Sequence, residues 1–227
     1  DLTTIGIRGE ESGWYGIAYV GSRLAGGSLP HTQLQTLKRG DSGQTLAQHM
    51  RSVGVDVDAL KSAAPWITAA NTKAFIELHI EQAPILVNEG LPVAIRTTIR
   101  GNVRFPYARC MGRYDHSGAT PRIHRSDALL AVVELLRELD EFWIAREAAG
   151  APDTVFTVGK LFTDAAHHAM TKVPGRVDFT LNFGGTTQDF LDACRARTYA
   201  TAERLAAERH VAFDLGELVD LGVEHRR

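Results

Sequence analysis

The chain has 227 residues, of which 44% are hydrophobic and 23% charged, and its formal net charge at pH 7 is -2. This composition excludes a disordered chain, which would lack the apolar surface needed to offset the entropy lost on ordering. The near-zero charge provides no basic surface for nucleic acid, and no apolar run approaches the roughly 18 residues that cross a bilayer.

The first part of the chain, to about residue 98, mixes expected strands and expected helices. Residues 2–8 and 73–79 have the apolar content of strands, and the second segment alternates. The expected helices lie at residues 10–24, where the apolar spacing is weak, from residues 42–45 to about residue 54, and at residues 82–89. This mixture predicts an α/β layer domain.

The second part, residues 99–215, has a more regular pattern. Strands are expected at residues 103–111, 154–162, 176–183 and 210–215, and helices at residues 124–149 and 187–209. Pro106 indicates an edge or a bulge in the first of these strands, because proline cannot donate to a ladder. The order βαββαβ predicts the split-βαβ, or ferredoxin-like, arrangement. Residues 216–227 are expected to return toward the first part.

The first expected strand starts almost at the beginning of the sequence, with no polar segment ahead of it. A strand without neighbours exposes unpaired backbone groups. We therefore expect the chain to be a piece of a longer protein, or one subunit of a split protein.

Four residues in three segments could carry chemistry. Glu10 and Glu11 follow the first expected strand, where α/β proteins bind ligands, although such a pair taken alone is more often a solvated acidic turn, because charged residues are mostly exposed. His79 ends the second expected strand and is a possible zinc ligand or a structural histidine. His116 lies in a loop of small residues, where it either reaches substrate or caps a turn. The adjacent pair His167–His168 is expected at the surface.

Taken together, four motifs occur in a specific order. They are Gly9-Glu10-Glu11-Ser12 with Gly21-Ser22-Arg23, then Glu77-Leu78-His79-Ile80-Glu81-Gln82, then His116-Ser117-Gly118-Ala119-Thr120-Pro121 with Arg125 and Asp127-Ala128, then Val173-Pro174-Gly175-Arg176-Val177. Over nearly the whole chain, this series resembles the metal-dependent amidohydrolases that include N-carbamoyl-L-amino-acid hydrolases and allantoate amidohydrolases. These enzymes are relatives of the dinuclear zinc aminopeptidases.

The resemblance implies a subunit of two domains. Residues 1–98 would be part of a zinc-peptidase-like α/β domain that holds two divalent ions, for which zinc, manganese and cobalt are all suitable. Residues 99–215 would be an inserted ferredoxin-like lid that also forms the interface of a homodimer. The implied substrate is a small ureido or amide compound, and the implied reaction is hydrolysis of a linear C–N bond.

The resemblance also implies roles for single residues. Glu10 matches the general base and Glu11 a metal ligand, and His79 matches the histidine ligand of the other ion. Two further positions match contacts to substrate, at Gln82 and at Thr171, where the family has asparagine. His116 matches the lid histidine that stabilises the oxyanion.

Besides Thr171, the chain departs from the family in three ways. Only two of the usual five metal-ligand positions are matched, whereas a catalytic zinc normally takes three protein ligands. Gly184 stands where the family has the arginine that binds the substrate carboxylate, and Ala83 stands where it has glycine.

Two hypotheses follow. The first is a metal-dependent hydrolase whose remaining ligands lie in a missing segment or a second subunit. The second is a non-catalytic dimerising or ligand-binding relative that has lost its metal site. Cys110 and Cys194 are too few for a disulfide scaffold, and a cytoplasmic location is expected under both hypotheses.

Overall fold

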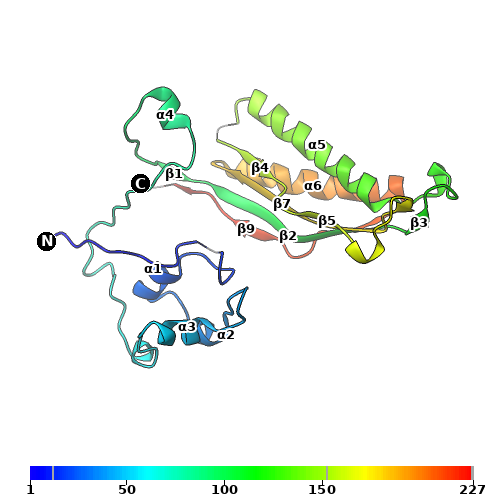
Figure 1. Cartoon of the computed structure of the whole chain (residues 1–227). Helices are drawn as coiled ribbons and strands as arrows, with labels where there is room; N and C mark the ends of the chain where they lie inside the picture. The colour runs from blue at the N-terminus through cyan, green and yellow to red at the C-terminus, as the bar shows by residue number, and fades with distance from the viewer. Residues whose placement is uncertain (12, 152, 226–227) are drawn as a thin grey trace. The chain divides into compact units, whose positions relative to one another are not determined.

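A computed structural model describes residues 1–11, 13–151 and 153–225 (Figure 1). The chain divides into two compact units, residues 1–84 and residues 85–227, each described separately below. Among the described residues, no helix is long and apolar enough to cross a membrane.

The first unit consists of short helices joined by irregular segments. Its helices are α1 (Val20–Ala25), α2 (His31–Thr36), α3 (Leu46–Ser52) and the 3-10 turn η1 (Ala59–Lys61). The start of α3 is fixed by a capping box, in which the Thr45 hydroxyl accepts from Gln48 N and the Gln48 side chain accepts from Thr45 N. A small core holds these helices together: Leu29, Leu34, Leu46, Ala47 and Val57.

The strands expected at residues 2–8 and 73–79 do not form, so the sequence analysis was wrong there: both segments are irregular. Apolar alternation marks a segment that suits a sheet, but a strand exists only where a second strand completes its ladder. In the described part of the first unit, the sole β interaction is the isolated bridge between Lys38 and Thr45. Ile76 and Leu78 are accordingly 90% and 94% exposed. The helix expected at residues 10–24 was also wrong for most of its length, since only α1 forms.

The second unit is built around a six-stranded antiparallel sheet in the order β4-β7-β2-β8, with β5 also pairing with β7 and β9 with β2. Its strands are β2 (Gly101–Met111), β4 (Val155–Thr157), β5 (Leu161–Thr163), β7 (Arg176–Gly185), β8 (Ala212–Asp214) and β9 (Val219–Leu221). Its long helices are α5 (Ala128–Ala148) and α6 (Gln188–Arg209). Both lie on one face of the sheet (Figure 1).

Smaller elements complete this unit. They are α4 (Ile85–Glu89), β1 (Thr98–Ile99), β3 (Asp115–His116), the 3-10 turns η2 (Arg122–His124) and η3 (Ala165–His167), β6 (Lys172–Val173) and β10 (Glu224–His225). Strand β1 pairs with β10 and β3 pairs with β6. The last residues described therefore return to the start of this unit.

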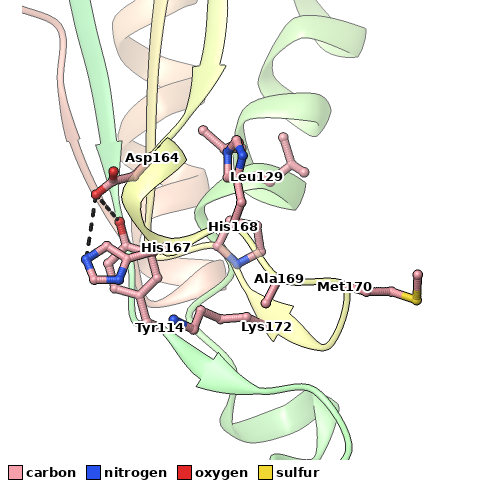
Figure 2. Close-up of a pocket in the computed structure, with 10 residues that line it drawn as sticks. Tyr114, Leu129, Asp164, His167, His168, Ala169, Met170 and Lys172 are labelled. Carbon is pink, nitrogen blue, oxygen red and sulfur yellow. Dashed lines mark hydrogen bonds and ion pairs between the residues drawn. The ribbon is translucent and has the colours of Figure 1, made fainter.

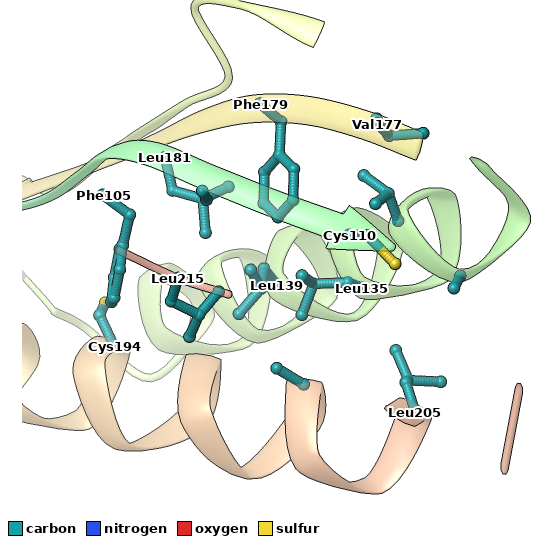
Figure 3. Packing of buried hydrophobic residues seen from close by; sticks show 14 of the residues in the cluster. Phe105, Cys110, Leu135, Leu139, Val177, Phe179, Leu181, Cys194, Leu205 and Leu215 are labelled. Carbon is teal, nitrogen blue, oxygen red and sulfur yellow. The ribbon is translucent and has the colours of Figure 1, made fainter. Parts of the chain in front are cut away.

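The core of the second unit lies between the sheet and the two long helices (Figure 3). Alternate residues of β7 are buried, as the sequence pattern predicts: Val177, Phe179, Leu181 and Phe183. They pack with Phe105 and Cys110 of β2, Leu135 and Leu139 of α5, and Cys194 and Leu205 of α6. Burial of this apolar surface is the main force that fixes the helices on the sheet.

The central strand β2 contains the irregularity that Pro106 predicts. Its register with β7 shifts between Phe105 and Ala108. On its other side, β9 pairs only with residues 102–104 and β8 only with residues 109–111. Pro106 thus falls where the ladder is interrupted. No neighbouring strand has a carbonyl there that would need the N–H that proline lacks.

The other expected boundaries shift by a few residues. The strand expected at residues 154–162 forms as two strands, β4 and β5. The helix expected from residue 124 begins at Ala128, because the side chain of Asp127 accepts a hydrogen bond from Leu130 N and caps it there.

Candidate functional site

The segment that contains Glu10 and Glu11 is tied to the start of α1 by its backbone. Tyr19 N donates to Glu10 O and Val20 N to Gly9 O, both at 2.8 Å. A Cβ at Gly21 would lie 2.2 Å from Arg8 O, so only glycine allows this close approach. The segment with Gly9, Glu10 and Glu11 thus lies beside the segment with Gly21, as the motif suggests. Glu10 is half-buried and Glu11 is exposed. Ser12 of this motif lies outside the described residues.

His79 and Gln82 lie in the irregular segment that follows residue 72, and both are exposed. The imidazole of His79 contacts the carbonyl oxygen of Ile80 through Nδ1. Gln82 has a left-handed backbone, with φ of 60°. Across the part of the chain that the structure describes, no three histidine, cysteine, aspartate or glutamate side chains come together as a metal site.

His116 and Thr171 are brought together by the short ladder between β3 and β6. Ser117 N donates to Thr171 O at 2.8 Å, and His116 lies directly opposite Lys172. Gly118 N donates to His116 Nδ1 at 3.2 Å. A neutral imidazole that accepts at Nδ1 carries its proton at Nε2, so His116 Nε2 can donate to an oxygen of a bound molecule.

A cavity of about 430 Å³ lies beside this ladder (Figure 2). It is lined by Tyr114, Leu129, Thr163, Asp164, His167, His168, Ala169, Met170, Lys172 and Pro174. Figure 2 shows Tyr114 and His167 both directed at the carboxylate of Asp164. Tyr114 Oη donates to Asp164 Oδ2 at 3.0 Å, and His167 Nε2 is 3.9 Å from the same oxygen.

Hydrogen bonding keeps Asp164 ionised. Its pKa is lowered, first by the hydrogen bond that it accepts from Ala166 N and then by the one from Tyr114. The pKa of Tyr114 is raised, chiefly by desolvation and next by its bond to Asp164. Tyr114 therefore stays a protonated donor at neutral pH. The ring of His167 packs on that of Tyr114, with 4.4 Å between centroids.

Gly184 is buried in β7. A Cβ there would lie 2.7 Å from Val155 Cγ2 and 3.3 Å from Asn102 Oδ1. A side chain at this position would press on the Val155 side chain of β4. The structure therefore leaves little room for the arginine that the resemblance led us to expect at this position.

Sequence reasoning identified His116 and Thr171 but missed Tyr114, Asp164 and Lys172. It expected His167–His168 at the surface; both are exposed, and both line the cavity. A local signal existed in the run of polar residues at 163–172, but the partner Tyr114 is about fifty residues away, and only the fold joins them.

Comparison with known proteins identifies relatives of about twice this length. The chain is 35% identical over 217 residues to the N-carbamoyl-L-amino-acid amidohydrolase of Paenarthrobacter aurescens, which covers 96% of this chain and 50% of that protein. It is 32% identical over 222 residues to the N-carbamoyl-L-amino acid amidohydrolase of Geobacillus stearothermophilus, with 97% and 51% covered. No family model matches.

The fold agrees with these relationships. The structure superposes on an amidase of the hydantoinase/carbamoylase family from Burkholderia phymatum with a TM-score of 0.71 and 24% identity, covering 95% of this chain and 50% of that one. The chain spans about half the length of the curated relatives that it matches. Over this shared length, the chain is related in sequence to N-carbamoyl-L-amino-acid amidohydrolases and has the fold of a hydantoinase/carbamoylase amidase.

Proposed function

We propose that this chain is part of an enzyme that hydrolyses linear C–N bonds in ureido or amide compounds of the N-carbamoyl-L-amino-acid or allantoate type. The observation that carries this proposal is the arrangement of His116. Its Nδ1 is occupied by Gly118 N, so its Nε2 is left as a donor on a short, hydrogen-bonded ladder. A fixed donor of this kind stabilises the negative oxygen that develops when a carbonyl carbon is attacked.

In this proposal, each remaining candidate has its own role. Glu10 takes the proton of the attacking water, which is ordinary work for a carboxylate within reach of it. Gln82 and Thr171 contact the substrate. Residues 1–98 belong to the catalytic domain and residues 99–215 form a ferredoxin-like lid. This assignment is supported by the motif order and by the strand order of the sheet.

The described residues do not by themselves fit a pair of metal ions. Glu11 and His79 are the two candidate ligands, both are exposed, and in the described part of the chain neither belongs to a group of three ligating side chains. A catalytic zinc normally takes three protein ligands. A zinc, manganese or cobalt site at Glu11 and His79 would therefore need ligands in addition to these two.

A second candidate function has its own support. The buried Gly184 and the unclustered ligands favour a relative that binds small molecules or dimerises without catalysis. A homodimer through the lid and a cytoplasmic location fit both candidates and are part of the proposal.

The test combines metal content with turnover. The purified protein is dialysed against zinc, manganese or cobalt, analysed by plasma mass spectrometry, and assayed for ammonia released from N-carbamoyl-L-amino acids and allantoate. We expect His116→Ala to lower kcat by about 10²–10³-fold with little change in KM. His124→Ala, at another exposed histidine of the same unit, is the control. A metal-loaded protein that releases no ammonia from any of these compounds would overturn the hydrolase proposal and leave the non-catalytic candidate.

A further inference from the structure

One face of the β3–β6 ladder opens onto the cavity. Ser117 and Thr171 form a hydrogen-bonded pair, so the neighbouring pair of His116 and Lys172 is a non-hydrogen-bonded one. In such a pair the Cα atoms are about 4.5 Å apart and the side chains project from the same face. Tyr114, two residues before His116, and Pro174, two residues after Lys172, continue this face, and both line the cavity together with Lys172.

Lys172 is the cation of this face. Its Nζ lies 6.0 Å from the centre of the Tyr114 ring, and it forms no ion pair with any residue that the structure describes. Most arginines of this unit are paired with a carboxylate, for example Arg109 with Asp178 and Arg209 with Glu134. The ammonium of Lys172 is thus available to an anion that enters the cavity.

The one carboxylate that lines the cavity is already committed. Asp164 accepts from Ala166 N through Oδ1 and from Tyr114 Oη through Oδ2. His167 lies on the same oxygen at 3.9 Å and partly offsets the negative charge when it is protonated. The volume of about 430 Å³ lies within the usual range for small-molecule sites.

We propose that this cavity binds the carboxylate of the substrate, with Lys172 as the residue that contacts it. The inference rests on the proposed function, in which His116 acts at the reacting carbonyl. An N-carbamoyl amino acid has its carboxylate only a few bonds from that carbonyl, a separation comparable to that of two opposed residues on a ladder. Gly184 leaves little room for an arginine to bind carboxylate, and Lys172 supplies the charge from another strand.

The experiment compares two probes that differ only in charge. N-carbamoylglycine and its uncharged amide, N-carbamoylglycinamide, are titrated calorimetrically into the whole protein in the presence of a chelator, so that neither is consumed. We expect the carboxylate to bind more tightly than the amide. Lys172→Met should weaken binding of N-carbamoylglycine about tenfold or more and leave the amide unchanged, because a charge-assisted contact is lost.

Two further variants make the result specific. Lys172→Arg keeps the charge and should retain most of the preference, which also controls for loss of fold. Lys160→Met removes an exposed lysine of the same unit that does not line the cavity and should behave as the wild type.

A preference for the carboxylate that survives Lys172→Met would overturn the assignment, and so would equal binding of both probes by the wild type. Neither result would affect the proposed function, which is judged by ammonia release. If the wild type binds neither probe but still releases ammonia from ureido compounds, the cavity assignment fails and the hydrolase proposal stands.

Discussion

Arg109 donates a hydrogen bond to Asp178, the residue directly opposite it across the β2–β7 ladder, with 2.7 Å between Nε and Oδ1. Arg176, two residues before Asp178 on the same strand, donates to both oxygens of that carboxylate at 2.7 and 3.1 Å. Two guanidinium groups therefore hold one carboxylate on the face of the sheet opposite the helices.

This pairing makes stability depend on pH. The pKa of Asp178 is lowered, first by the hydrogen bond from Arg176 and then by that from Arg109, against the opposing effect of desolvation. A carboxyl with a lowered pKa stabilises the folded state above its unfolded pKa of about 3.9, and this contribution is lost as the pH falls through the folded value.

We therefore expect Asp178→Asn to lower the urea midpoint of unfolding at about pH 7. Between about pH 5 and pH 2, the midpoint of this variant should decrease less steeply with falling pH than that of the wild type. Asp140→Asn, at an exposed aspartate of α5, serves as the matched control and should leave both the midpoint and the slope as in the wild type. If the urea midpoint of Asp178→Asn depended on pH as steeply as that of the wild type, the stabilising role of the Asp178 pairing would be contradicted.

The core tolerates loss of volume poorly. Phe183 is fully buried and stacks on Phe156, with 4.8 Å between centroids and 12° between the rings. Phe183→Ala should lower the free energy of unfolding by about 3–5 kcal/mol in urea denaturation, because it leaves a cavity and removes a buried ring. Phe162→Ala, where the ring is 60% exposed, should cost far less. Equal costs at the two positions would show that this core is not packed as described.

An arginine at position 184 should destabilise the second unit. We expect Gly184→Arg to destabilise the second unit by about 1–3 kcal/mol, since its Cβ would lie 2.7 Å from Val155 Cγ2. Addition of Val155→Ala should recover part of the loss. The control is Gly159→Arg at an exposed position, where the nearest atom to the new Cβ is Thr180 Oγ1 at 3.5 Å. Thermal denaturation measures all three variants; a Gly184→Arg protein as stable as the wild type would mean that β4 can move aside.

The two thiols should be inert in the folded protein. Cys110 and Cys194 are buried, and desolvation raises the pKa of each thiol to about 12. At about pH 8 we expect almost no reaction with a disulfide reagent, followed by two thiols per chain in urea, because only the thiolate reacts. Rapid labelling of the native protein would contradict the burial of Cys110 and Cys194.

The second unit was predictable from sequence wherever a residue pattern reports a buried face. The alternation at residues 176–183 identified β7, and the apolar spacing after Asp127 identified α5. The same reasoning was wrong for residues 2–8 and 73–79, because a ladder depends on a partner strand that local alternation does not reveal.

The candidate site was predictable only in part. The motifs indicated His116 and Thr171, but nothing in either motif reveals that Lys172 lies opposite His116. That relationship depends on a register between segments more than fifty residues apart, which is set by the whole fold.

Each edge of the six-stranded sheet consists of two separate strands of three residues, β4 and β5 on one side and β8 and β9 on the other. A further strand that approached either edge would find three consecutive residues to pair with before the backbone turned away. Long exposed edges are the templates on which proteins add strands without limit. The interruptions at Pro106 and at residues 158–160 therefore disfavour polymerisation of this unit through its sheet.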